Sequence, residues 1–124
     1  MSRPTSQPLV RRARADADVL EAIDHYLVES SAAALGFVDA LEAAYAHIRR
    51  APATGSPRYA HELNLPGLRF WSLKRYPYLV FYVERADRIE VWRVLHGQRD
   101  LPRWLQEGAD DAPPRERLQP KPTR

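Results

Sequence analysis

A histidine and several charged residues follow the last apolar run of this sequence, in the segment "VWRVLHGQRD" at 91–100. His96, Arg99 and Asp100 come after residues typical of a buried strand, with Gly97 among them. A histidine titrates near neutral pH and can exchange a proton, and an arginine can bind a phosphate. The same residues can also cap a turn and present charge to a protein partner. The segment therefore points either to proton-transfer chemistry or to a docking surface.

The composition excludes several classes of protein. The chain has 124 residues, which suits one domain, and 44% of them are hydrophobic. It has no cysteine, which excludes disulfides and thiolate metal sites. No apolar run approaches the roughly 20 residues that cross a bilayer, and no secretory signal follows Met1. His25, His47 and His61 lack the spacing of metal ligands. We expect a cytoplasmic protein with no metal, no cofactor and no membrane contact.

Charge is distributed unevenly along the chain. Residues 16–48 contain seven acidic residues and no lysine or arginine, whereas residues 49–104 contain eleven lysines and arginines against five acidic residues. This asymmetry indicates either two kinds of partner or one partner with its own charge pattern. A simple requirement for solubility would produce the same asymmetry.

Two helices are predicted in the first half of the chain, over 16–29 and over about 32–50. Each has an apolar stripe at helical spacing: Leu20, Ile23 and Leu27 in the first, and Phe37, Leu41, Ala44 and Ile48 in the second. The connection between them is very short, so we expect an antiparallel helical hairpin.

Several single residues support these boundaries. Ser31 is a suitable N-cap for the second helix, and Asp16 and Asp18 suit the first turn of the first helix, where the helix dipole favours negative charge. Gly36 indicates a close approach between helices, and Gly97 a reversal of the chain where a side chain would clash.

The second half predicts strands. A loop is expected over 51–67, followed by strands over 68–73, 78–83 and 89–95 that form an antiparallel meander, and residues 9–11 suit a short first strand. The fold class is α+β, with an antiparallel helical hairpin packed on a small twisted antiparallel sheet. We expect one domain over 9–106, a flexible N-terminus over 1–8 and a flexible, proline-rich tail over 107–124.

The sequence resembles the RelE/ParE superfamily of bacterial toxins from toxin–antitoxin modules, over about residues 9–105. The resemblance rests on "RRAPATGSPR" at 49–58, on "RYPYLVFYVE" at 75–84, and on "VWRVLHGQRD" followed by "LPRWL". It implies a hairpin on a twisted sheet and an antitoxin that wraps the toxin. It also implies one of two activities: RelE-like members cleave mRNA on the ribosome, and ParE-like members poison DNA gyrase.

The two branches require different residues. In a ribonuclease, His96 would be the general acid or base, and Arg93, Arg99 and Arg75 would bind the phosphate. Ribonuclease relatives, however, begin the central strand with an arginine where this chain has Tyr78, and the segment "LPRWLQEGADD" offers no tyrosine or histidine. We therefore interpret the chain as a ParE-like gyrase poison without catalysis of its own. A RelE-like mRNA interferase and a catalytically inactive, antitoxin-binding co-repressor are the alternatives.

Two contact surfaces follow from this interpretation. The target is expected to contact Arg75, Arg93, His96, Arg99, Asp100 and Trp104. The antitoxin is expected to contact Tyr26, Phe37, Tyr45, Arg69 and Lys74. We expect the antitoxin to be ParD-like and to wrap the toxin with an acidic segment, because the sheet half of the chain is basic. The toxin would reach operator DNA only through the antitoxin.

Overall fold

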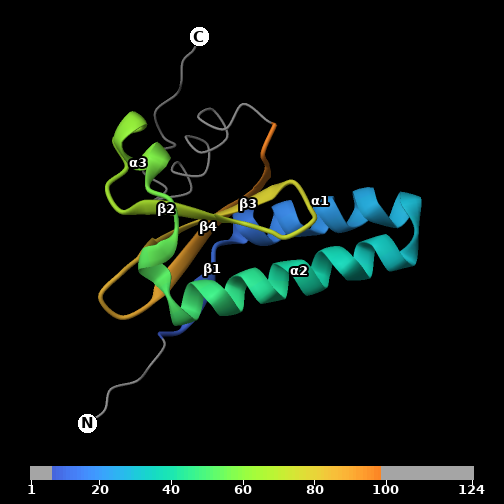
Figure 1. Ribbon diagram of the computed structural model, residues 1–124, viewed down its shortest axis with the longest axis horizontal. Helices are drawn as coiled ribbons and strands as arrows, with labels where there is room; N and C mark the ends of the chain where they lie inside the picture. The colour runs from blue at the N-terminus through green and yellow to red at the C-terminus, as the bar shows by residue number, and fades with distance from the viewer. Residues whose placement is uncertain (1–6, 99–124) are drawn as a thin grey trace.

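The computed structural model describes residues 7–98, and its elements follow the expected order (Figure 1). They are β1 (Leu9–Arg11), α1 (Ala13–Glu29), α2 (Ser31–Arg50), the 3-10 helix η1 (Pro52–Thr54), α3 (Arg58–Glu62), β2 (Leu68–Ser72), β3 (Tyr78–Glu84) and β4 (Ile89–His96). The predicted α+β fold, a helical hairpin packed on a small sheet, is confirmed. Residues 99–124, which include the expected tail over 107–124, lie outside the described residues.

The sheet has four strands in the order β1-β4-β3-β2. Strands β2, β3 and β4 form the expected antiparallel meander. β1 pairs with β4 in parallel, with Leu9 opposite Ile89, so the sheet is mixed and not wholly antiparallel. Residues before β1 also contact the sheet, since the Pro8 carbonyl accepts a hydrogen bond from the Ile89 N–H at 2.9 Å. Pro8, which was expected within a flexible N-terminus, is therefore held against β4.

The hairpin of α1 and α2 covers one face of the sheet, and the apolar stripe of α2 is buried as predicted. The stripe predicted for α1 is wrong in part: Ile23 packs against the core, but Leu20 is 63% exposed and Leu27 is 50% exposed. The buried positions of α1 are Ala15, Asp18 and Ala22. Because these side chains are small, α1 lies close to its neighbours on this face. The helix is rotated about its axis so that the larger leucines point outward.

The hairpin connection and the following loop differ in detail from the prediction. Ser30, not Ser31, caps α2, because its hydroxyl accepts the Ala33 N–H at 2.9 Å. The segment over 51–67 is not only loop, since it contains η1 and α3. Tyr59 of α3 packs against Phe81 with 6.0 Å between ring centroids, which gives this short helix an apolar contact on the second face of the sheet.

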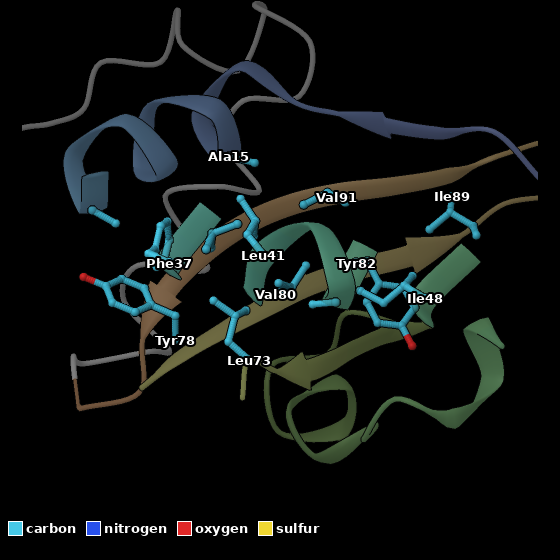
Figure 2. Packing of buried hydrophobic residues seen from close by; sticks show 13 residues of the cluster. Ala15, Phe37, Leu41, Ile48, Leu73, Tyr78, Val80, Tyr82, Ile89 and Val91 are labelled. Carbon is cyan, nitrogen blue, oxygen red and sulfur yellow. The ribbon is translucent and has the colours of Figure 1, made fainter. Parts of the chain in front are cut away.

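The core divides between the two faces of the sheet. In β3, Val80 and Tyr82 point to the hairpin, whereas Phe81 and Val83 belong to the cluster that α3 covers. Figure 2 shows the hairpin side, where side chains of both helices meet those of the sheet. A bulge interrupts the pairing of β3 with β4 and leaves Trp92 without an opposite residue on β3.

Two glycines have roles other than those predicted. A Cβ at Gly36 would overlap the hydroxyl of Tyr76, so a tyrosine and not the other helix approaches this position. The Tyr76 hydroxyl donates to the Ala33 carbonyl at 3.0 Å. A Cβ at Gly97 would meet the Pro77 carbonyl at an ordinary 3.6 Å, so no clash requires glycine there.

Candidate protein-interaction surfaces

Arg93 lies inside the protein and not on a docking surface. It is 1% exposed, and its Nε and Nη2 donate to the two carboxylate oxygens of Asp18 at 2.8 Å each. The prediction that Arg93 contacts a target, or a phosphate, is therefore wrong. Asp18 was expected to interact only with the helix dipole, but it also binds the buried side chain of Arg93.

The position of Asp18 follows from the short β1 strand. β1 pairs with β4 only as far as Val91, so the next part of that edge of β4 has no neighbouring strand. The first turns of α1 lie along this edge, and Asp18 accepts the backbone N–H of Val94 at 2.9 Å. The carboxylate thus takes the place of a strand partner while it neutralises Arg93. A buried cation requires such a partner, because an unpaired charge in the interior is very costly.

His96 ends β4 and closes the turn that follows. Its Nδ1 accepts the Gln98 backbone N–H at 3.1 Å, and its ring meets Tyr78 edge to face at 5.2 Å between centroids. The neutral ring must then hold its proton on Nε2. This geometry supports the interpretation of His96 as a turn cap, with the Gln98 N–H as a partner. Arg99, Asp100 and Trp104 lie outside the described residues.

Arg75 and His96 lie at the same end of the sheet. Arg75 is exposed in the turn before β3, and His96 is paired with Tyr78, the first residue of that strand. The Gly97 N–H donates to the Pro77 carbonyl at 2.8 Å and holds the two turns together. The fold therefore brings together two of the residues expected to contact a target.

The aromatic residues expected to anchor an antitoxin are mostly core residues. Phe37 is fully buried and stacks on Tyr26, with 5.6 Å between ring centroids, so Phe37 cannot contact a partner. Tyr26 is half-buried in the same cluster, with Tyr76 at 5.1 Å. Tyr45 is half-buried, and its hydroxyl has no hydrogen-bond partner among the described residues. Burial raises the pKa of the Tyr45 hydroxyl well above its ordinary value.

A groove of about 590 Å³ lies between α2 and the β2 strand with its following turn. We call it the α2–β2 groove. Its lining includes small side chains of α2, two aromatic residues and four charged residues: Ala40, Ala43 and Ala44; Trp71 and Tyr76; and Asp39, Arg50, Lys74 and Arg75. Lys74 and Arg75, which were expected on different surfaces, therefore share one surface. Arg69 does not line the groove, and its Nη1 donates to the Gly55 carbonyl at 2.8 Å.

One wall of the α2–β2 groove is a stacked pair of rings. His47 lies parallel to Trp71, with 3.8 Å between ring centroids. The Thr54 hydroxyl donates to the Ala51 carbonyl at 2.7 Å, so its oxygen accepts from Nε2 of His47 at 2.9 Å. This chain of hydrogen bonds orients the imidazole ring flat against the indole. The sequence analysis did not predict this pair, because the two residues are far apart in the chain.

A second hollow, of about 620 Å³, lies between α1 and the end of β4. Its acidic residues and histidines distinguish it from the α2–β2 groove: Asp18, Glu21, Asp24, His25 and His96. The hairpin is thus flanked by a groove with a mainly basic rim on the α2 side and by an acidic hollow on the α1 side. The uneven charge of the sequence becomes an uneven charge around the hairpin.

Several of the remaining arginines serve the structure and not a surface. Glu90 accepts hydrogen bonds from Arg88 at 2.6 Å, from Arg12 at 3.3 Å and from Arg85 at 3.4 Å. Trp92 donates to the same carboxylate at 3.4 Å. Burial by itself would raise the pKa of Glu90, but the Arg88 hydrogen bond and the neighbouring arginines lower it on balance.

Replacing Glu90 by glutamine should lower the free energy of unfolding at neutral pH by about 1–3 kcal/mol, because the arginines lose their charged acceptor. A lowered folded-state pKa stabilises the fold above the ordinary value of 4.5 and loses this contribution as the pH falls through the folded value. Urea unfolding from pH 7 to pH 3 should therefore show less acid-dependent loss in the variant than in the wild type. Glu84→Gln, at an exposed position, is the control, and equal pH profiles for wild type and E90Q would contradict the role of Glu90.

The hairpin on a four-stranded mixed sheet is the fold of a RelE/ParE superfamily toxin. Residues 9–101 match the family model described as the ParE toxin of the type II toxin–antitoxin system parDE. The chain belongs to this ParE toxin family, which confirms the resemblance seen in the sequence. The family implies a ParD-like antitoxin as the partner.

One solved structure adds support for the fold. The chain is similar to a structure described as the chromosomal ParDE TA system from P. aeruginosa, with a TM-score of 0.62 and 22% identity, over 75% of this chain and 98% of that chain. None of the curated proteins matches the sequence. Within residues 7–98, no helix is both long and apolar enough to span a membrane.

Proposed function

We propose that this protein stops growth by poisoning DNA gyrase in the cytoplasm and that a ParD-like antitoxin neutralises it. Membership of the ParE toxin family supports the proposal. Of the two branches of the superfamily, the resemblance associates the ParE-like branch with gyrase and the RelE-like branch with cleavage of mRNA. The antitoxin would also connect the toxin to operator DNA, since the toxin itself would bind DNA only through that partner.

The strongest observation in favour of this activity is the burial of Arg93. A ribonuclease needs exposed cations at the scissile phosphate and a free acid or base beside them. Arg93 is occupied by Asp18, and Nδ1 of His96 is occupied by the Gln98 N–H. Tyr78, which stands where ribonuclease relatives have an arginine, is buried. Arg93 is therefore in the interior, and Arg75 is the exposed arginine at the end of the sheet that carries His96.

The surface proposed to contact gyrase is the end of the sheet that carries Arg75 and His96. Arg99, Asp100 and Trp104 follow His96 in the sequence and complete the proposed contact set, without Arg93. An exposed arginine beside a capped, rigid turn suits recognition of a protein surface, since little conformational freedom is lost on binding.

The test combines two assays on wild type and His96→Gln. We expect wild-type toxin to inhibit supercoiling by purified gyrase and to leave mRNA intact on purified ribosomes. His96→Gln should keep its activity within a few-fold, because an amide oxygen can accept the Gln98 N–H in place of Nδ1. If His96 were a general acid or base, activity would instead fall by roughly 100-fold or more.

Growth arrest in cells links these assays to function. Induction without antitoxin should give a DNA-damage response before any general loss of mRNA. Rapid mRNA cleavage, together with a folded but inactive His96→Gln variant, would favour the ribonuclease instead. A wild-type chain that binds the antitoxin but inhibits neither gyrase nor translation would identify an inactive co-repressor.

A further inference from the structure

The side of the helical hairpin that is turned away from the sheet carries exposed leucines. On α1, Leu20 and Leu27 are about two helical turns apart, which places them on one face of the helix, opposite its buried positions. On α2, Leu35 is 66% exposed and lies opposite the buried stripe of that helix. Exposed apolar side chains that gather in one region commonly mark a surface that another molecule covers.

The turn between the helices brings these leucines together at one end of the hairpin. Ser30 lies between α1 and α2, and each helix extends about 1.5 Å per residue from this turn. Leu27 closely precedes Ser30 and Leu35 closely follows it, so the two side chains lie at nearly the same level along the hairpin. Figure 1 shows that this end of the hairpin projects past the strands of the sheet. Both leucines remain exposed, so no element described over 7–98 covers them.

Acidic side chains lie among the leucines. Asp24 lies between Leu20 and Leu27 at helical spacing on α1, and Glu42 lies about two turns after Leu35 on α2. Both carboxylates are exposed, and residues 16–48 contain no lysine or arginine. This side of the hairpin therefore combines apolar surface with negative charge. We define its five residues, Leu20, Asp24, Leu27, Leu35 and Glu42, as the outer hairpin face.

The charge of the outer hairpin face restricts the kind of molecule that can cover it. A second copy of the chain would bring two negative faces together, and like charges in a contact are costly. The antitoxin segment expected from the basic half of the chain is acidic, so it would be repelled in the same way. The face therefore favours a basic partner whose surface also has apolar side chains to match the leucines.

The outer hairpin face lies at the same end of the molecule as the proposed gyrase contact. His25, in the second half of α1, lines one hollow together with His96. Tyr26, the next residue of α1, contacts Tyr76, the neighbour of Arg75, with 5.1 Å between ring centroids. One partner can therefore reach the outer hairpin face and the end of the sheet at the same time. Positive charge at Arg75 and negative charge on the hairpin would together fix the orientation of that partner.

A DNA-binding enzyme has a basic surface, because it neutralises phosphate groups with lysine and arginine side chains. We propose that the outer hairpin face binds a basic, partly apolar surface of DNA gyrase. The inference rests on the proposed poisoning of gyrase, and it adds a second contact to the one at Arg75 and His96. The leucines would pack on apolar side chains of gyrase, while Asp24 and Glu42 would pair with its cations.

Leu27→Gln tests the apolar part of this contact. Glutamine is a good helix former and the position is exposed, so the fold should be little affected, which circular dichroism checks. We expect about tenfold weaker inhibition of supercoiling by purified gyrase and an equal loss of affinity for the enzyme. The matched control is Val10→Thr, which replaces an exposed apolar side chain of β1 by a polar residue suited to a strand. This control should inhibit gyrase as the wild type does.

The double variant Asp24→Lys/Glu42→Lys tests the charge of the face. Association with purified gyrase, without DNA, is measured across a salt series. The variant should associate about tenfold or more slowly at low salt, and its rate should depend less on salt than that of the wild type. The matched control is Glu62→Lys/Glu84→Lys, which makes the same change in net charge at exposed positions of α3 and β3. If Leu27→Gln fails to fold, this pair of variants still tests the outer hairpin face.

The outcomes separate this inference from the proposed function. Wild-type inhibition and association in both hairpin variants would overturn the inference while leaving gyrase poisoning intact. Variants that inhibit gyrase normally but lose affinity for the protein encoded beside the toxin gene would overturn it and assign the face to the antitoxin. Self-association of the purified toxin that only the hairpin variants abolish would overturn it in favour of a second copy of the chain. If the wild type does not inhibit gyrase, the proposed function itself fails, and the inference fails with it.

Discussion

Replacing Asp18 by asparagine is expected to lower the free energy of unfolding by about 3–5 kcal/mol, because it removes the carboxylate that pairs with the buried guanidinium of Arg93. Asparagine keeps the size of the side chain, and its amide oxygen can still accept the Val94 N–H. The loss therefore reports mainly on the charge. Since small domains are stable by only about 5–15 kcal/mol, much of the total stability would disappear. Urea unfolding followed by circular dichroism measures the change.

Asp16 supplies the matched control on the same helix. Its carboxylate pairs with Arg11 at 2.8 Å, but both side chains are 49% exposed. Asp16→Asn should therefore cost less than about 1 kcal/mol. The double variant Asp18→Leu/Arg93→Met should be more stable than Asp18→Asn, because it removes both buried charges. If Asp18→Asn and Asp16→Asn cost the same, the ion pair does not have the importance that its burial indicates.

Gly55→Ala is expected to lower the free energy of unfolding by about 3 kcal/mol, from overpacking and from the loss of buried hydrogen bonds. A Cβ at Gly55 would overlap the hydroxyl of Tyr82 and would lie 2.9 Å from its Cζ and 3.0 Å from the Phe70 carbonyl oxygen. The Tyr82 ring cannot move away easily, because it is fully buried and its hydroxyl donates to the Pro52 carbonyl at 2.6 Å. That hydroxyl also accepts the Gly55 N–H at 3.1 Å. Thermal and urea unfolding measure the loss.

Two further variants identify the cause of this effect. Gly97→Ala adds the same methyl group where its nearest neighbour would be at 3.6 Å, so it should cost less than about 1 kcal/mol. Tyr82→Phe removes the hydroxyl group that the new methyl group would overlap. The double variant Gly55→Ala/Tyr82→Phe should therefore cost less than the sum of the two single variants. Additive costs would show that the clash with Tyr82 is not the reason for glycine at position 55.

The sequence alone was sufficient for the fold class, the family resemblance and the apolar stripe of α2. The stripe could be predicted because Phe37, Leu41 and Ile48 are large, apolar and regularly spaced, so they must be buried on any fold that uses this helix. β3 was recognised as a central strand for the same reason, since both of its faces are apolar. The stripe and the strand depend on local periodicity, which the order of residues contains completely, whereas the family resemblance rests on the segments at 49–58, 75–84 and 91–105.

Only the tertiary structure decided which polar residues are buried and which face of α1 is inside. Arg93 and Asp18 are 75 positions apart, and nothing local predicts that the short β1 strand ends where an α1 carboxylate can take its place. The same long-range geometry turned Leu20 outward and Ala22 inward. It also placed Arg50 of α2 beside the Lys74–Arg75 turn and formed the groove between them. Contacts between distant segments depend on how elements pack, and residue spacing along one element does not contain that information.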